Sequence, residues 1–171
     1  SYTANILAKA ADVTSTDFSK LGIGMQYAGG TAKGAGISMR DAASALGELS
    51  NNGLEASQAG TSLQRIIVRL SSGSQSATKA FKEYGLSMDD FKDKSGKLKS
   101  IPEIFDQINK KVPKADRLKV FNQAFGQSAQ SAAVILSNNL KDLDEVEGKV
   151  KTAYNEDYVG KLALRNMKSA K

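Results

Sequence analysis

The sequence predicts an all-α fold, a compact domain of several helices. Apolar residues recur about every 3.6 positions along most of the chain, which is the period of an α-helix. With 40% hydrophobic and 25% charged residues, the 171-residue chain can fold and bury a core. We therefore expect helices joined by short turns, αα-hairpins among them, and a helical arm at the C-terminal end.

Two helices are predicted at the start of the chain. Residues 1–13 have a helical pattern but no initial methionine, so we expect a fragment of a longer protein. The second helix follows a capping sequence at 15–18, and its apolar face includes Phe18 and Leu21. It is rich in small residues, which would let other helices approach it closely.

An αα-hairpin is predicted next. Ser38 is the expected cap of its first helix, with Asp41 completing a weak capping box, and Asn52-Gly53 provides a left-handed turn that ends this helix. Ser57 is the expected cap of the second helix. The second helix carries the most regular apolar stripe of the sequence, made of Ala59, Leu63, Ile66, Ile67 and Leu70.

Gly60 lies inside this second helix, where glycine is about 1 kcal/mol less favourable than alanine. A compensating contact is needed, and the close approach of another backbone would provide one. The preceding helix offers a facing surface of small residues, namely Ala42, Ala43, Ala45 and Gly47. We therefore expect Gly60 to pack against that helix.

The middle of the chain is less regular. A short helix is predicted to end at Gly85, and residues 88–100 predict either a small β-hairpin or an extended loop around a turn at 94–96. Pro102 suits the first turn of the next helix, and Pro113 ends it.

Further helices are predicted toward the C-terminal end. Leu118, Phe121 and Phe125 repeat at near-helical spacing up to Gly126, and an alanine-rich helix continues to about Leu140. Beyond it, apolar residues are spaced out between charges, which predicts a longer, half-exposed helix or a coiled-coil arm. These residues are Leu143, Val146, Val150 and Tyr154.

The residue types that are missing exclude most classes of enzyme. The chain has no histidine and no cysteine, so zinc, haem and iron–sulfur sites lack their usual ligands. Ser-His and Cys-His catalysis are excluded for the same reason. No run of about 18 apolar residues predicts a membrane span, and no signal peptide is visible. We expect no enzymatic activity, no cofactor and no metal.

Several stretches fail to match the sites that they suggest. Residues 21–37 are rich in glycine, but Lys33 precedes Gly34, and no strand leads in as a phosphate-binding loop requires. The acidic stretches at 89–93 and 142–148 lack oxygen ligands at the alternate positions that an EF-hand needs. No carboxylate pair lies in apolar surroundings that would raise a pKa for acid–base catalysis.

The net charge of +6 makes a basic helical DNA-binding module an alternative. Residues 1–74 carry six basic and five acidic residues, and residues 75–171 carry 18 and 13. The excess lies in stretches that mix Lys with Asp and Glu, which is typical of solvated helix faces rather than a one-sided basic patch. DNA binding would show an affinity that falls steeply with salt.

Residues 36–72 resemble the core region of bacteriophage tail tape measure proteins. In that family, a helix starting at Gly-Ile-Ser leads through Asn-x-Gly to Ser-x-Ala-Gly-Thr-x-Leu-x-Arg. The matching residues are Gly36, Ile37, Ser38, Ala42, Ala43, Gly47, Asn51, Gly53, Ser57, Ala59, Gly60, Thr61, Leu63 and Arg65, with Phe125 and Gly126 in a later segment. The resemblance covers about residues 1–153, which we expect to form one domain, with 154–171 as a helical or flexible extension.

The resemblance implies a structural protein of a phage or prophage tail. Such a protein is long and mostly helical, sets the tail length, lies in several copies inside the tail tube, and leaves when DNA is ejected. The implied partners are tail tube and tail tip proteins, tail assembly chaperones and other copies of itself. The implied location is the virion tail, and the bacterial host cytoplasm during assembly. We expect no small-molecule substrate, nucleic-acid partner or membrane contact.

Two further points concern function. A muralytic enzyme is a third hypothesis, because some tape measure proteins carry such domains elsewhere in their length, but no residue here supports it. Length measurement needs an extended chain at about 1.5 Å per helical residue. This chain predicts a compact domain instead, so we expect the flanking sequence to provide most of the ruler.

Overall fold

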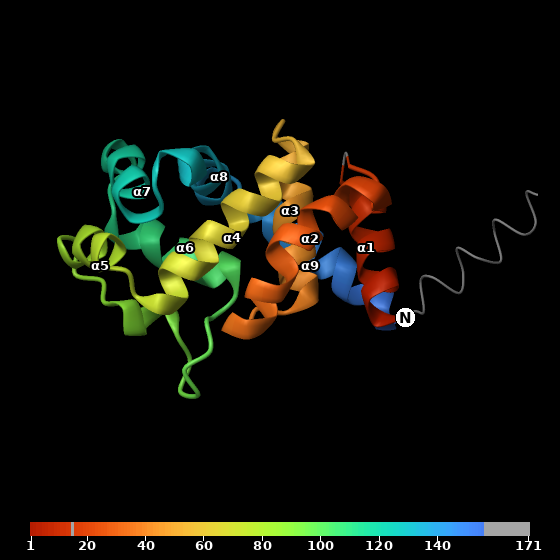
Figure 1. The fold of residues 1–171 in the computed structure, drawn as a ribbon, viewed down its shortest axis with the longest axis horizontal. Helices are drawn as coiled ribbons and strands as arrows, with labels where there is room; N and C mark the ends of the chain where they lie inside the picture. Colours follow the sequence, from red (N-terminus) through yellow and green to blue (C-terminus); the bar gives the residue numbers. More distant parts are fainter. Residues whose placement is uncertain (15, 156–171) are drawn as a thin grey trace, which may run out of the picture.

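The computed structural model describes residues 1–14 and 16–155, with side chains as far as residue 151, and consists of helices joined by short connections (Figure 1). Its helices are α1 (Tyr2–Val13), α2 (Phe18–Ala35), α3 (Met39–Asn51), α4 (Ala56–Ser72), α5 (Gln75–Lys82), α6 (Ile101–Lys111), α7 (Arg117–Phe125), α8 (Gln127–Asn138) and α9 (Leu140–Asn155). Two short 3-10 helices are η1 (Met88–Phe91) and η2 (Lys114–Asp116). No β-strand occurs within the described residues, which confirms the predicted all-α class.

Helix α4 crosses the middle of the molecule between two groups of helices (Figure 1). Helices α1, α2, α3 and α9 form one group, and α5, α6, α7 and α8 form the other. Helix α3 contacts α1, α2, α4, α6, α8 and α9, and residues 41–49 of this helix are all buried. Helix α3 is therefore the centre of the core.

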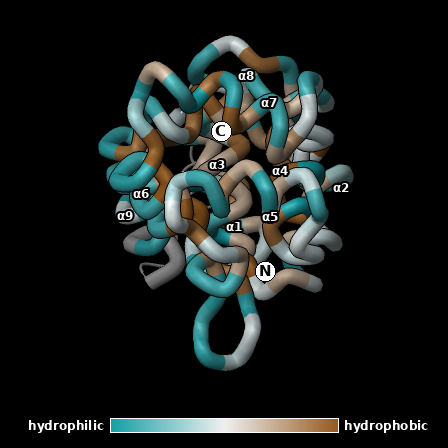
Figure 2. The backbone as a smooth tube through the Cα atoms, turned by 90° about the vertical axis from the view of Figure 1, so that its left-hand side faces the viewer, coloured by the Kyte–Doolittle hydropathy of each residue, from teal (hydrophilic) through white to brown (hydrophobic). Residues whose placement is uncertain are grey.

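Phenylalanine rings fill the core of the second group. The fully buried rings are Phe81, Phe91, Phe105, Phe121 and Phe125. Centroids of neighbouring rings lie between 5.2 and 6.4 Å apart, within the usual range for aromatic pairs. In Figure 2 the hydrophobic positions gather inside the molecule, whereas the projecting loop at 93–97 is hydrophilic and exposed.

Several predicted helix boundaries are confirmed. The Ser38 hydroxyl accepts a hydrogen bond from the Asp41 N–H at 3.0 Å and so caps α3. Gly53 has φ +94° in the turn that follows this helix. Pro102 lies in the first turn of α6, and Pro113 follows its end.

The predicted start of α4 is wrong, because the helix begins before Ser57. Glu55 is the N-cap and makes no side-chain capping bond, and Ser57 is the second residue of the helix. The Leu54 N–H donates to the Leu49 carbonyl at 3.1 Å, so the turn closes early. This turn therefore sets the start of α4, and a serine cap is not needed.

Of the two alternatives for residues 88–100, the structure has the extended loop, at 92–100, while residues 88–91 form η1. Its only pairing within the described residues is an isolated antiparallel bridge between Lys92 and Leu98. The Asp93 carboxylate accepts hydrogen bonds from the Ser95 N–H at 2.8 Å and holds the turn. The Leu98 N–H donates to the Ala35 carbonyl at 2.9 Å, so the returning segment bonds to the end of α2 instead of extending a ladder.

Two residues expected on apolar faces are exposed. Phe18 is 50% exposed and Leu118 is 58% exposed. The buried face of α2 includes Gly24, and the buried face of α7 includes Val120 and Ala124. Phe18 and Leu118 lie outside these buried faces.

Helix α9 is the half-exposed helix of the two alternatives, as far as its side chains are described. Leu143, Val146 and Val150 are buried, and the helix packs against α1 and α3. It therefore belongs to the body of the domain and does not project as an arm. Residues 154 and 155 of the expected extension at 154–171 are the end of α9. The side chain of Tyr154 and residues 156–171 lie outside the described residues.

Gly60 packs closely against another helix, but that helix is α2 and not α3 as expected. A Cβ atom on Gly60 would lie 2.6 Å from the Gly24 carbonyl oxygen and 2.9 Å from the Gly24 Cα. The apolar stripe of α4, which includes Leu63, points into the core, and this orientation turns Gly60 toward α2. The two backbones therefore meet where neither residue has a side chain.

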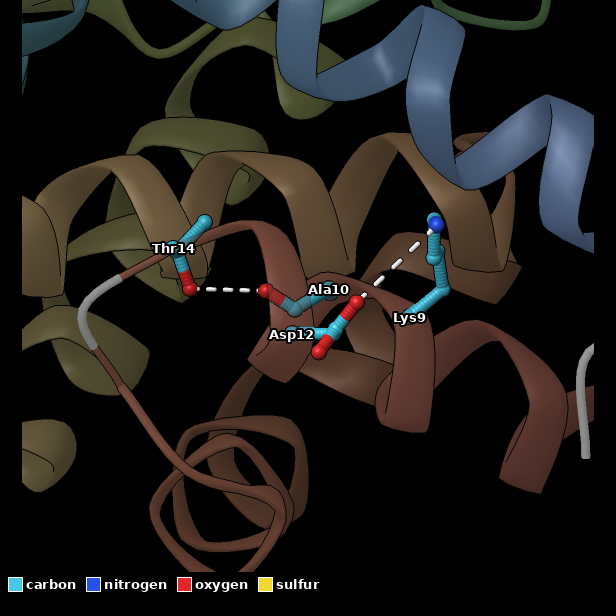
Figure 3. Close-up of polar contacts among 4 residues, drawn as sticks. All are labelled: Lys9, Ala10, Asp12 and Thr14. Atoms are coloured by element: carbon cyan, nitrogen blue, oxygen red, sulfur yellow. Dashed lines mark hydrogen bonds and ion pairs between the residues drawn. The ribbon is translucent and has the colours of Figure 1, made fainter. Parts of the chain in front are cut away.

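Gly47 on α3 instead faces Thr14, the residue that follows α1. A Cβ on Gly47 would lie 2.7 Å from the Thr14 Cγ2. The Thr14 hydroxyl donates to the Ala10 carbonyl at 2.7 Å, which fixes the side chain at the end of α1 (Figure 3). The glycine therefore makes room for α1 to end against α3.

We predict that Gly60→Ala destabilises the protein, although alanine favours helices more than glycine does. The added methyl would overlap the backbone of α2, and such overpacking costs about 1–3 kcal/mol. Gly30→Ala is the matched control, because a Cβ there meets nothing within 4 Å. This control should stabilise by up to about 1 kcal/mol. Denaturant unfolding measures both, and a gain in stability for Gly60→Ala would contradict the close contact.

Candidate functional site: a groove along α4 and a buried carboxyl pair

A groove of about 650 Å³, lined mostly by polar residues, lies along α4, where this helix meets the start of α8. Its lining residues are Gln58, Thr61, Ser62, Gln64, Arg65, Val68, Arg69 and Ser128. Two of them are arginines, and none is acidic. The groove therefore carries a positive charge.

The two arginines lie one turn apart on α4. Arg69 Nη1 donates to Ser76 Oγ at 2.9 Å, and Arg65 lies beside Gly126, whose Cβ would be 3.6 Å from Arg65 Nη1. The ion pairs within the described residues are confined to α1 and α6, so neither arginine has a carboxylate partner there. Both guanidinium groups can therefore donate to a partner molecule.

The junction between α7 and α8 forms one end of the groove. Gly126 has φ +87° and ψ 160°, a conformation that glycine adopts almost alone, and it places α8 directly after α7. The buried Ser62 hydroxyl donates to the Ser128 carbonyl at 3.4 Å and joins α4 to α8. The groove can thus bind carboxylate or carbonyl oxygens of a protein partner.

The structure brings three residues of the sequence motif to this groove, namely Thr61, Arg65 and Gly126. The other motif residues lie elsewhere. Ala59, Leu63 and Phe125 are in the core, and Gly60 is at the α2 contact. Ser38 is the N-cap before α3, Gly47 and Asn51 lie on α3, and Gly53 lies in the turn after it. Ser57 is in the first turn of α4.

Asp41 and the half-buried Glu147 form a carboxyl pair with buried oxygens, which the sequence did not predict. Asp41 is only 2% exposed, and its Oδ2 accepts a hydrogen bond from the Ile101 N–H at 2.8 Å. Asp41 Oδ1 and Glu147 Oε1 are both buried and receive no donor from any other described group. The expectation that no carboxylate pair lies in apolar surroundings is therefore wrong, because α9 carries Glu147 to the N-terminal end of α3.

Burial raises the pKa of Glu147 to about 9, with further increases from its hydrogen bond to Asp41 and from the Asp41 charge. Burial also raises the pKa of Asp41, although hydrogen bonds from Glu147 and Ile101 and the charge of Arg40 lower it in part. At neutral pH the two carboxyls therefore share a proton, which supplies the donor that both buried oxygens need.

Glu48 is a second buried acid on α3. Burial raises its pKa, and the nearby Asp142 of α9 raises it further, against a lowering by the hydrogen bond from Asn52. The Asn52 Nδ2 donates to Glu48 Oε1 at 3.1 Å, whereas Oε2 has no partner. Acidic groups thus lie at both ends of the contact between α3 and α9.

The carboxyl pair lies apart from the groove, since neither Asp41 nor Glu147 lines it. Its raised pKa therefore does not indicate acid–base chemistry on a molecule bound along α4. Within the described residues, no cluster of three or more acidic side chains has the arrangement of a metal site. None of the described helices has the length and apolar character to span a membrane.

Comparison with known proteins relates the chain to phage tails. A family model described as phage-related minor tail protein matches residues 1–126. A probable tape measure protein of Escherichia phage P2 is 30% identical over 141 residues, which are 79% of this chain and 17% of that protein. A tape measure protein of Pneumococcus phage Dp-1 is 28% identical over 107 residues, 63% of this chain and 9% of that protein.

The chain therefore spans less than a fifth of the length of these relatives. No solved structure matches it.

We predict that Asp41→Ala lowers the free energy of unfolding by about 1–3 kcal/mol, because the buried Ile101 N–H would lose its acceptor. Asp41→Asn retains an oxygen acceptor at this position and should keep most of the stability. Urea unfolding of both variants at pH 7 separates the lost hydrogen bond from the lost charge. An equal loss in the two variants would show that the bond to Ile101 contributes little.

Proposed function

Because the chain belongs to the family of phage-related minor tail proteins, we propose that it is one region of a tape measure protein, which sets tail length and occupies the lumen of the tail tube. The family gives the chain a structural role in the virion tail. The two tape measure relatives support the finer assignment. The single observation that carries it is the similarity to the phage P2 protein across 79% of this chain.

We propose that the region acts through protein–protein contacts and has no catalytic role. The groove along α4 supports this proposal, since Arg65 and Arg69 have no carboxylate partner among the described residues and Val68 beside them is 44% exposed. Such a mixture of arginine and exposed apolar surface is typical of protein interfaces. The proposed partners are tail tube and tail tip proteins, tail assembly chaperones and other copies of the chain, which it meets first in the host cytoplasm during assembly.

We further propose that residues 1–153 form one domain and that the flanking sequence provides most of the ruler. The packing of α9 on α1 and α3 supports a domain that includes this helix. A fully extended helix of this domain would span about 230 Å at about 1.5 Å per residue. Among the described residues the longest helix, α2, has 18 residues, so the folded domain is far shorter than about 230 Å.

In-frame deletions in the flanking helical sequence of the full-length parent protein should shorten the phage tail by about 1.5 Å per residue removed. Deletion of residues 1–153 should shorten it less per residue, because a folded domain adds less length than an extended helix. Electron microscopy of tails from phage carrying deletions of two sizes in each region gives both slopes. If the flanking deletions left the tail length unchanged, the proposed role in setting tail length would be wrong. If tail length fell equally per deleted residue in both regions, the proposal that the flanking sequence provides most of the length would be wrong.

A further inference from the structure

Helix α9 is held against α3 by a contact that is apolar in its middle and acidic at both ends. Leu143 and Val146 are the buried apolar residues between the ends. We call the four acidic residues of this contact the acid seam. They are Asp41 and Glu48 of α3 and Asp142 and Glu147 of α9.

Three oxygens of the acid seam receive no donor from the rest of the described domain. They are Asp41 Oδ1, Glu147 Oε1 and Glu48 Oε2, which are all buried. Two ionised carboxylates cannot be buried side by side without a large electrostatic penalty. A proton between Asp41 and Glu147 removes the repulsion and provides the missing hydrogen bond. Docking of α9 on α3 therefore requires a proton that a free α9 does not need.

The surrounding charges do not replace this proton. Arg40 on α3 favours the ionised carboxyls, but its Nε is buried without a partner, and no ion pair joins Arg40 to them within the described residues. Glu103 of α6 and Asp144 of α9 add negative charge. On α1, Lys9 extends toward α9 and pairs with Asp12 of its own helix at 4.0 Å (Figure 3). Helix α8 carries no charged residue.

We propose that the acid seam is a proton-controlled latch, which keeps α9 docked on α3 while the seam holds a proton and lets α9 separate from the rest of the domain when that proton leaves. We expect the separation to be local, because α9 packs mainly on α1 and α3, whereas the phenylalanine rings of the second group pack on one another. The inference stands on the contacts of α9 alone and does not rest on the proposed function.

The direction of the pH dependence follows from the two states. Glu147 has a pKa of about 9 when docked, against a usual value of 4.5. The docked state therefore binds the proton more tightly than the open state, and docking is most stable below about pH 4.5. The opening equilibrium constant of α9 should rise as the pH increases toward about 9, by about tenfold per pH unit for the release of one proton. Above that pH the dependence should level off.

Native-state hydrogen exchange followed by mass spectrometry tests the latch in the 171-residue chain. Exchange is measured between about pH 5.5 and 8.5, with each rate divided by the intrinsic rate of the unprotected amide, so that local opening is separated from base catalysis. Peptides from 143–150 report on α9, and peptides from 59–70 report on α4. We expect the opening constant of α9 to rise by about tenfold per pH unit. The opening constant of α4 should not show this rise.

Glu147→Gln removes the titrating group but keeps the shape and an N–H donor for Asp41. The opening constant of α9 should then lose most of its pH dependence. Glu145→Gln is the matched control, because Glu145 is exposed on the same helix, and it should retain the wild-type slope. If Glu147→Gln does not fold, the comparison of α9 with α4 in the wild-type chain still decides the question.

Three results would overturn the latch. The first is an opening constant of α9 that does not change with pH. The second is an equal slope in α4 and α9, which would mean that the whole domain unfolds as one unit. The third is a slope of wild-type size in Glu147→Gln, since Glu147 would then not be the group that holds the proton.

Discussion

Helix α3 has no exposed side between residues 41 and 49, and the arrangement of the other helices follows from this constraint. Six helices contact it. Other helices can pack on every side of α3 because it carries the small residues Ala42, Ala43, Ala45 and Gly47. Neighbouring backbones can approach closely where no large side chain lies between them. The chain also returns to α3 through a hydrogen bond, since Asp41 accepts from the first N–H of α6. The start of the second group of helices is thereby tied to the centre of the first.

Much of this fold could be predicted from local signals, because helix caps, proline positions and apolar stripes depend on residues a few positions apart. Ser38 and Pro102 marked helix starts correctly for this reason. Gly60 indicated a close contact through its unfavourable helix propensity. The partner of Gly60 could not be predicted from the sequence, because a contact with Gly24 depends on how far α4 is rotated about its axis. That rotation is set by the packing of the whole domain. If the apolar stripe of α4 is assigned one residue too early or too late, Gly60 is predicted to face a different helix.

The site was predictable to a smaller extent. Arg65 and Gly126 were named as motif residues, but their meeting at the α4 groove requires the turn between α7 and α8 to be placed beside α4. The carboxyl pair gave no signal at all. Asp41 had an ordinary explanation as the partner of a capping serine, and Glu147 lies in a stretch of mixed charge that is typical of solvated helices. Only the docking of α9 buries Glu147, and no pattern within that helix specifies which helix it will meet.

The composition of α9 is explained by two opposing requirements. A helix docked by a wide apolar face would expose that face to water whenever it separated, and exposed apolar surface invites association with other chains. Helix α9 has a narrow apolar face and completes its contact with carboxyls instead, so it stays polar enough to remain in water when it is free. Buried polar pairs of this kind are often less stabilising than apolar residues of the same volume. In the latch that we propose, the acid seam stabilises the docking of α9 less than apolar residues of the same volume would, and it makes the strength of docking depend on the pH of the surrounding solution.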